Sequence, residues 1–124
     1  MAFYATTRAT SEDFMAIEQS IEDMELAINV NNMDDYVSAN LDFHEKIAKS
    51  SYNLVMYNLY QSINNLIEQA QVKAVTVQGV MNESLQFHKD ILQAMKQRNA
   101  ALASELMVKH INSVQGFLQK SQNE

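Results

Sequence analysis

The near absence of helix-breaking residues constrains the fold of this chain more than any other sequence feature. Its 124 residues include no proline and only two glycines, Gly79 and Gly116. Proline interrupts a helix and glycine weakens one, whereas Ala, Leu, Met, Gln, Glu and Lys, which are plentiful here, favour helices. The sequence therefore predicts an all-α protein.

Length and composition indicate one folded domain over residues 1–124. A chain of this length can bury a core without disulfides or a structural metal. Hydrophobic residues make up 47% of the sequence and charged residues 19%, which is the balance of a folded soluble protein and not of a disordered chain.

Charge and cysteine content exclude several classes of function. The chain has no cysteine, so thiolate nucleophiles, disulfides and thiolate metal ligands are excluded and any metal must bind histidine or oxygen. A net charge of −6 repels phosphate backbones, which makes this chain alone a poor binder of nucleic acid. No long apolar run or signal peptide is present. We therefore expect a cytoplasmic protein without membrane contact.

Apolar residues recur at helical spacing in five segments, and the short connections between them favour an antiparallel bundle of about five to six helices. The first helix is capped by Thr10 or Ser11 and the second begins around Asp34. The inward row of the first helix is Phe14, Ile17, Ile21, Met24 and Ile28. The second carries two neighbouring inward rows, namely Tyr36, Asn40, Phe43 and Ile47, and Val37, Leu41, His44 and Ala48.

The third predicted helix runs from about Leu54 past Ala70, the fourth is capped by Asn82 and the fifth by Asn99. The residues before Thr10 are predicted to end another helix that is too short to stand alone. The inward rows of these three helices are Leu59, Ile63, Leu66 and Ala70; Leu85, His88, Leu92 and Met95; and Ala103, Leu106, His110, Val114 and Phe117.

The three histidines of the chain, His44, His88 and His110, each fall on the apolar row of a different helix. Taken singly, each is more often a hydrogen-bonded core histidine than a ligand. Taken together they favour a metal site, because buried neutral imidazoles need partners and one divalent cation serves all three.

Asn40 strengthens the metal hypothesis because it lies one turn before His44 on the same buried face. Asp42 is a better ligand by chemistry, but it lies about 200° around the helix from His44 and should face solvent. Three imidazoles and one amide oxygen suit Zn²⁺ or Ni²⁺ better than Ca²⁺ or Mg²⁺. Such a set has no negative charge, so the cation should have open positions that bind a small carboxylate.

Three segments resemble the C-terminal ligand-binding domain, called the FCD domain, of GntR-superfamily regulators of the FadR branch. They are "ATTRATSEDF", "DYVSANLDFHEKIAKSSYN" and "FHKDILQAMKQRNAALASELMVKHI". The distinctive parts are an acid or amide four residues before the His of an "FH" pair, the Asn that follows (Asn53) and a His before "ILQAM". The interval from His88 to His110, 110 − 88 = 22 residues, is similar to the family spacing.

This resemblance implies an antiparallel bundle whose centre binds a divalent metal through Asn40, His44, His88 and His110, with a small carboxylate effector beside it. Asp is the commoner residue at the first position, and an amide there should weaken metal binding because it removes a negative charge. Tyr57 and Tyr60 are candidates for the edge of the effector pocket, although packing is the commoner role of such residues.

The resemblance also implies a homodimer that contacts DNA through a winged helix-turn-helix domain absent from this chain. The first helix of the family is largely missing, since only "AFYATTR" matches its end. We therefore expect a fragment of a longer transcription regulator that senses an effector and is not an enzyme.

Two other functions stay open at this stage. One is a metal-dependent hydrolase-like enzyme in which Glu83 or another carboxylate activates a metal-bound water. The other is a dimerisation bundle that binds no metal.

Overall fold

The structure is a computed structural model that describes residues 2–77 and 79–123, except for the side chains of residues 63, 67, 117, 118 and 120–123. Six α-helices and no strand occur in these ranges. In chain order they are α1 (Ala2–Arg8), α2 (Ser11–Asn29), α3 (Met33–Ser50), α4 (Leu54–Ala74), α5 (Val80–Lys96) and α6 (Ala100–Asn123). The predicted all-α bundle is confirmed.

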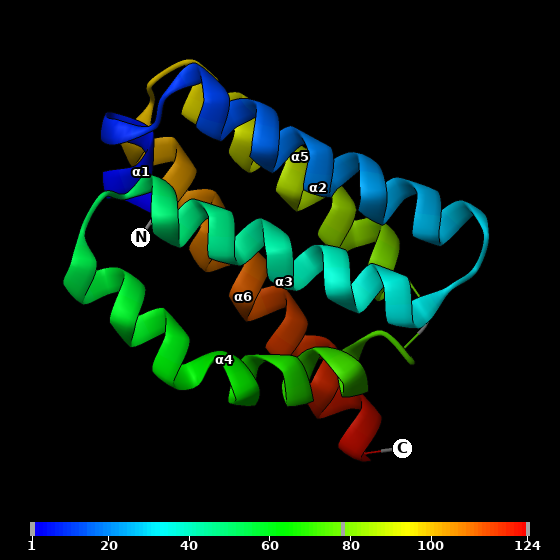
Figure 1. Ribbon diagram of the computed structural model, residues 1–124. Helices are drawn as coiled ribbons and strands as arrows, with labels where there is room; N and C mark the ends of the chain where they lie inside the picture. The colour runs from blue at the N-terminus through cyan, green and yellow to red at the C-terminus, as the bar shows by residue number, and fades with distance from the viewer. Residues whose placement is uncertain (1, 78, 124) are drawn as a thin grey trace.

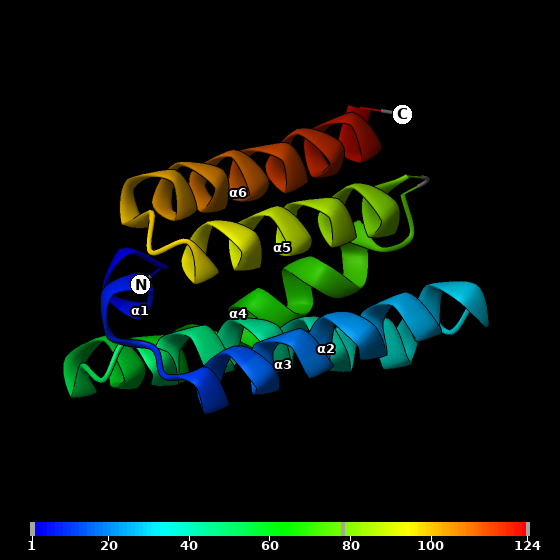
Figure 2. The same ribbon diagram turned by 90° about the horizontal axis from the view of Figure 1, so that it is seen from above.

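Two antiparallel helix pairs form the body of the bundle (Figures 1 and 2). The pair α2–α3 faces the pair α5–α6, and α2 packs directly on α5. The short helix α1 covers one end, where it contacts α3, α5 and α6. Helix α4 crosses the side of the bundle between α3 and α6 (Figure 1). This arrangement leaves an interior space bounded by α3, α4 and α6.

Polar side chains cap the helices, and most of the predicted helix starts are confirmed. Thr10 forms a capping box with Asp13, in which the Thr10 hydroxyl accepts from the Asp13 N–H and the Asp13 carboxylate accepts from the Thr10 N–H. Asn32, Asn53 and Asn99 each accept from the backbone three residues later. These bonds fix where α2, α3, α4 and α6 begin.

The fourth predicted helix is α5 in the structure, and the prediction that Asn82 caps it is wrong by about one turn. Helix α5 begins at Val80 and Asn82 lies inside it, while the residue before it, Gly79, has a left-handed backbone with φ 88° and no capping side chain. Glycine adopts this conformation without steric cost, so it can start α5 directly after the turn from α4.

The core is built from the rows predicted for α2, α3 and α5. Ile17, Met24, Phe43, Ile47 and Met95 are fully buried, and the histidine rows of α5 and α6 point to the same interior. The short helix α1 adds Ala2, Ala5 and Thr6 to this core. No helix in the described ranges is long and apolar enough to cross a membrane.

Helix α4 departs from the prediction. Leu59 and Leu66 were expected to face inward, but they are 57% and 67% exposed. The buried positions are instead Tyr60 and Ala74, with Ala70 partly buried. The expectations for the Ile63 and Phe117 side chains lie outside the described part of the structure. The inward face of α4 is therefore rotated by about one residue, which is about 100° on a helix.

Candidate metal and effector site

Three imidazoles from three helices meet in the interior of the bundle. His44 lies on α3, His88 on α5 and His110 on α6, and one ring nitrogen of each lies within 4.8 Å of the others. The His44 and His110 rings are stacked with centroids 5.8 Å apart. The Nε2 atoms of His88 and His110 are 3.2 Å apart. The structure therefore brings together the histidines singled out by the sequence, and their role as metal ligands stays a prediction.

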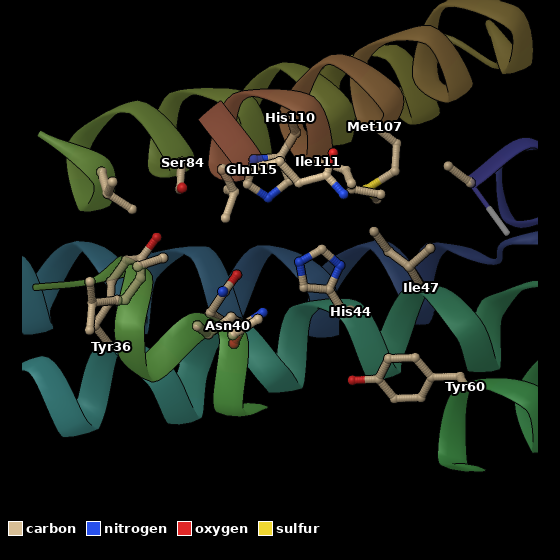
Figure 3. A pocket seen from close by; sticks show the side chains of 17 residues that line it. Tyr36, Asn40, His44, Ile47, Tyr60, Ser84, Met107, His110, Ile111 and Gln115 are labelled. Atoms are coloured by element: carbon tan, nitrogen blue, oxygen red, sulfur yellow. The ribbon is translucent and has the colours of Figure 1, made fainter. Parts of the chain in front are cut away.

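Helix geometry places Asn40 beside this cluster. Because Asn40 and His44 are one turn apart on α3, their side chains project from the same face, and Figure 3 shows both directed toward His110. The Phe43 ring packs against the His88 ring, with the two ring centroids 4.2 Å apart. Asn40 and His88 are buried, and the Asp42 side chain is exposed as predicted.

Burial keeps the three imidazoles neutral. It lowers the pKa of His44 to about 3, with a smaller effect from the charge of His110. Burial also lowers the pKa of His110 to about 4, against the opposing effect of Glu83, and it lowers the pKa of His88 well below its usual value. At neutral pH each ring therefore has a lone pair for a metal or a hydrogen-bond donor.

The cluster has fewer internal hydrogen bonds than its polar atoms require. His88 and His110 share at most one proton between their Nε2 atoms, so one donates and the other accepts. Their Nδ1 atoms and the Asn40 Oδ1 atom are buried and have no partner among the described residues. Unpaired buried polar atoms are unfavourable, and a cation bound between the imidazoles would give the Asn40 oxygen a partner. The donor set of three imidazoles and an amide oxygen thus fits a divalent transition metal.

A cavity of about 450 Å³ opens beside the cluster. Asn40, His44 and His110 line it, as Figure 3 shows, while His88 is not part of the lining. The opposite walls come from α4 and α6 and are mainly apolar. This volume is sufficient for a small organic ligand in contact with the histidine cluster.

The two tyrosines predicted at the pocket edge have different positions. Tyr60 lines the cavity and its hydroxyl donates to the Leu41 carbonyl at 3.1 Å. Burial, with a smaller contribution from nearby carboxylates, raises its pKa to about 12. Tyr57 is not part of the lining, and its hydroxyl pairs with Glu45 and Gln61.

Sequence reasoning missed several lining residues because it assigned them to the core or to solvent. The lining residues that it missed and that bear polar groups are Tyr36, Gln71, Ser84 and Gln115. A polar residue on the inner row of α4 was a usable signal for Gln71, but the predicted inner row of that helix was rotated. Glu83, the candidate base of the enzyme hypothesis, is not in the lining and accepts a hydrogen bond from Ser113.

Both arginines bind backbone carbonyls away from the cavity. Arg8 donates to the Ser51 carbonyl at 3.0 Å and Arg98 donates to the Thr6 carbonyl at 2.9 Å. The Arg98 guanidinium also lies over the Phe14 ring. Neither side chain lines the cavity, so both hold the α1 end of the bundle together.

Relatives of this chain are transcription regulators about twice its length. An HTH-type transcriptional regulator of Bacillus subtilis is 27% identical over 84% of this chain and 47% of its own length. The Uxu operon regulator of Haemophilus influenzae is 29% identical over 92% of this chain and 44% of its own length. The chain thus spans about half the length of the curated relatives that it matches.

Structural and family comparisons agree with these relatives. The structure of a GntR protein of Streptococcus agalactiae superimposes with a TM-score of 0.78 at 26% identity, over 91% of this chain and 50% of that one. The FCD domain family matches residues 1–113. The resemblance inferred from the sequence is thereby confirmed, and the chain belongs to the FCD domain family.

Proposed function

We propose that this chain is the effector-sensing and dimerisation domain of a cytoplasmic bacterial transcription regulator. In this proposal the centre of the bundle binds one divalent metal and a small carboxylate. The observation that carries it is the convergence of three neutral imidazoles from α3, α5 and α6 on one point beside a cavity, with His88 and His110 buried and His44 partly buried. Membership of the FCD domain family supports the regulatory role.

The proposed metal ligands are His44, His88, His110 and Asn40. The convergence of the imidazoles and the unpaired Asn40 Oδ1 atom support this assignment, because a bound cation would be the missing partner of that oxygen. Zn²⁺ and Ni²⁺ are the preferred ions, since imidazole and amide ligands suit borderline cations. A fourth ligand without charge leaves the full charge of the ion available to an anionic effector.

The effector is proposed to bind in the cavity with its carboxylate on the metal. Tyr60 and the inner face of α4 form the far wall, so a bound effector contacts α3, α6 and α4 together. It therefore favours the arrangement of these helices that it contacts best. In a homodimeric regulator this shift would reposition DNA-binding domains that lie outside these residues.

An enzyme is less well supported. A metal-bound water requires a nearby base, and Glu83 is bonded to Ser113 outside the cavity lining. The described lining contains no carboxylate.

Metal analysis of protein purified without a nickel column tests the proposal. We expect about one ion per chain in the wild type. Added Zn²⁺ at about 100 times its dissociation constant should stabilise the metal-free protein by about 3 kcal/mol, or about 10 °C in Tm. The His88→Gln variant should lose both the ion and the shift.

The matched control is Gln93→Ala, an exposed position on the same helix. It should keep both the bound ion and the thermal shift. Wild-type protein with no bound ion and no shift with Zn²⁺ or Ni²⁺ would leave the metal-free dimerisation bundle as the better account. Metal-dependent turnover of simple esters or amides would favour the enzyme.

A further inference from the structure

The cavity beside the histidine cluster is almost free of charge. Its described lining includes no Lys, Arg, Asp or Glu side chain. Most of its wall is apolar, with Ile47 from α3, Ala74 from α4, Val80 from α5 and Met107 and Val114 from α6. The chemistry of this wall limits which carboxylates can be bound.

A second carboxylate on the ligand would find no cation in the cavity. Both arginines of the chain are bonded to backbone carbonyls elsewhere. The charged groups that act on the lining are acidic, since Glu45 and Asp42 contribute to the raised pKa of Tyr60 and Glu83 raises that of His110. The cluster can compensate one anionic group through its proposed metal, and a second one would be desolvated without a partner.

A ligand with many hydroxyls would also bind poorly. Each hydroxyl loses its water on entering the cavity and needs a protein partner in exchange. The hydroxyls of Tyr36 and Tyr60 already donate to the Met81 and Leu41 carbonyls. The other polar lining residues away from the cluster are Gln71, Ser84 and Gln115. These side chains are too few to pair with a hydroxyl on every carbon of a sugar acid. Apolar groups gain instead, because each buried methylene tightens binding about three- to fourfold.

Gln71 is the polar group of α4 that lacks an assigned partner. Its side chain lines the cavity, and its Oε1 atom is buried without a hydrogen bond to any residue that the structure describes. The unpaired Asn40 oxygen has the proposed metal as its partner, whereas Gln71 lies on a different helix. A ligand hydroxyl can donate to the amide oxygen or accept from the amide nitrogen, so it matches Gln71 in either amide orientation.

We propose that the cavity selects a monocarboxylate with an apolar body and one hydroxyl, in which the carboxylate faces the histidine cluster and the hydroxyl pairs with the Gln71 amide. This inference rests on the proposed function and adds the chemical class of the effector. It excludes dicarboxylates, tricarboxylates and sugar acids as the best ligands.

Calorimetric titration of the Zn²⁺-loaded protein tests the selection with acids of equal chain length. Hexanoate carries one charge, adipate adds a second carboxylate, and gluconate adds hydroxyls along the chain. We expect hexanoate to bind at least about tenfold more tightly than adipate or gluconate. Tighter binding of adipate or gluconate overturns the inference but leaves the proposed metal and carboxylate site intact.

A series of ω-hydroxy monocarboxylates of increasing length, from about four to about ten carbons, tests the role of Gln71. At the length that reaches its amide, the hydroxyl should tighten binding about three- to tenfold over the parent acid. Gln71→Leu should remove this gain, measured as the ratio between the affinities of each ω-hydroxy acid and its parent acid in the same variant. The matched control Gln69→Leu, an exposed position on α4, should keep the gain.

Circular dichroism and thermal unfolding establish that the Gln71→Leu variant is folded, and its bound zinc is measured in the same sample. A hydroxyl gain that survives in this variant, or no gain at any length, overturns the inference. Failure of every carboxylate to bind the zinc-loaded protein overturns the effector part of the proposed function and the inference together.

Discussion

The four-helix body and α4 use their apolar residues differently. Along α2, α3 and α5 the apolar rows are buried, and Ile17, Phe43 and Ile91 have no exposed surface. Along α4, Leu59 and Leu66 face solvent, and its inner face lines a cavity. The body therefore supplies stability and fixes the histidines, whereas α4 completes the ligand site with little buried area of its own.

The largest difference between the two regions should appear on removing a side chain from the body. Phe43 is fully buried and contacts both His44 and His88. Phe43→Ala should lower the free energy of unfolding by about 4 kcal/mol, because it leaves a cavity under the cluster. Urea denaturation measures this change. A loss below about 1 kcal/mol would mean that the centre of the body is not close-packed.

Acid should destabilise the metal-free protein through the body and not through α4. His44, His88 and His110 have lowered folded pKa values, so the unfolded chain binds more protons below its own pKa of about 6.5. Stability is therefore complete above that pH and falls as the pH decreases. Each of these three histidines should cost about 1.4 kcal/mol at about pH 5.5, or about 4 kcal/mol together.

Urea denaturation at about pH 8 and about pH 5.5, with a chelator present, measures this loss. In the His110→Gln variant the loss should be about two thirds as large, since one of the three titrating groups is gone. Equal stability of the wild type at the two pH values would show that the histidines are accessible to protons in the folded state.

The position of Asn40 offers a smaller change within the same site. Asn40→Asp adds a negative charge beside the three imidazoles, so we expect about tenfold tighter Zn²⁺ binding, equivalent to about 1.4 kcal/mol. The same variant should be less stable without metal, because a buried carboxylate then lacks a cation. Competition with a coloured chelator measures the affinity. Unchanged affinity would place Asn40 outside the coordination sphere.

The accuracy of the sequence predictions also differs between the four-helix body and α4. The rows of α2, α3 and α5 were predicted correctly because each has one dominant apolar face, and His44 and His88 lie on two of these faces. Helix α4 has apolar residues on more than one face, so periodicity selected Leu59 and Leu66 in place of Tyr60 and Ala74. Which face turns inward is decided by packing against α3 and α6.

The candidate site shows the same limit at the level of single residues. Helical spacing identified Asn40 as the neighbour of His44, because that relation is local to α3. Gln71 and Ser84 reach the cavity only through the placement of α4 and α5, which no local pattern encodes. Asn82 illustrates a competing signal, since the left-handed Gly79 starts α5 one turn before that favourable cap residue.

The smallest effect should come from the exposed face of α4. Leu66 is 67% exposed, so Leu66→Gln should change the free energy of unfolding by no more than about 0.5 kcal/mol. The row that the sequence predicted would instead bury this side chain, and its replacement by an amide would then cost about 2 kcal/mol or more. Urea denaturation of the two proteins at low concentration, where chain association is minimal, distinguishes these values. A loss of the larger size would mean that α4 packs through Leu66 and that its wall of the cavity, including Gln71, is turned away from the ligand.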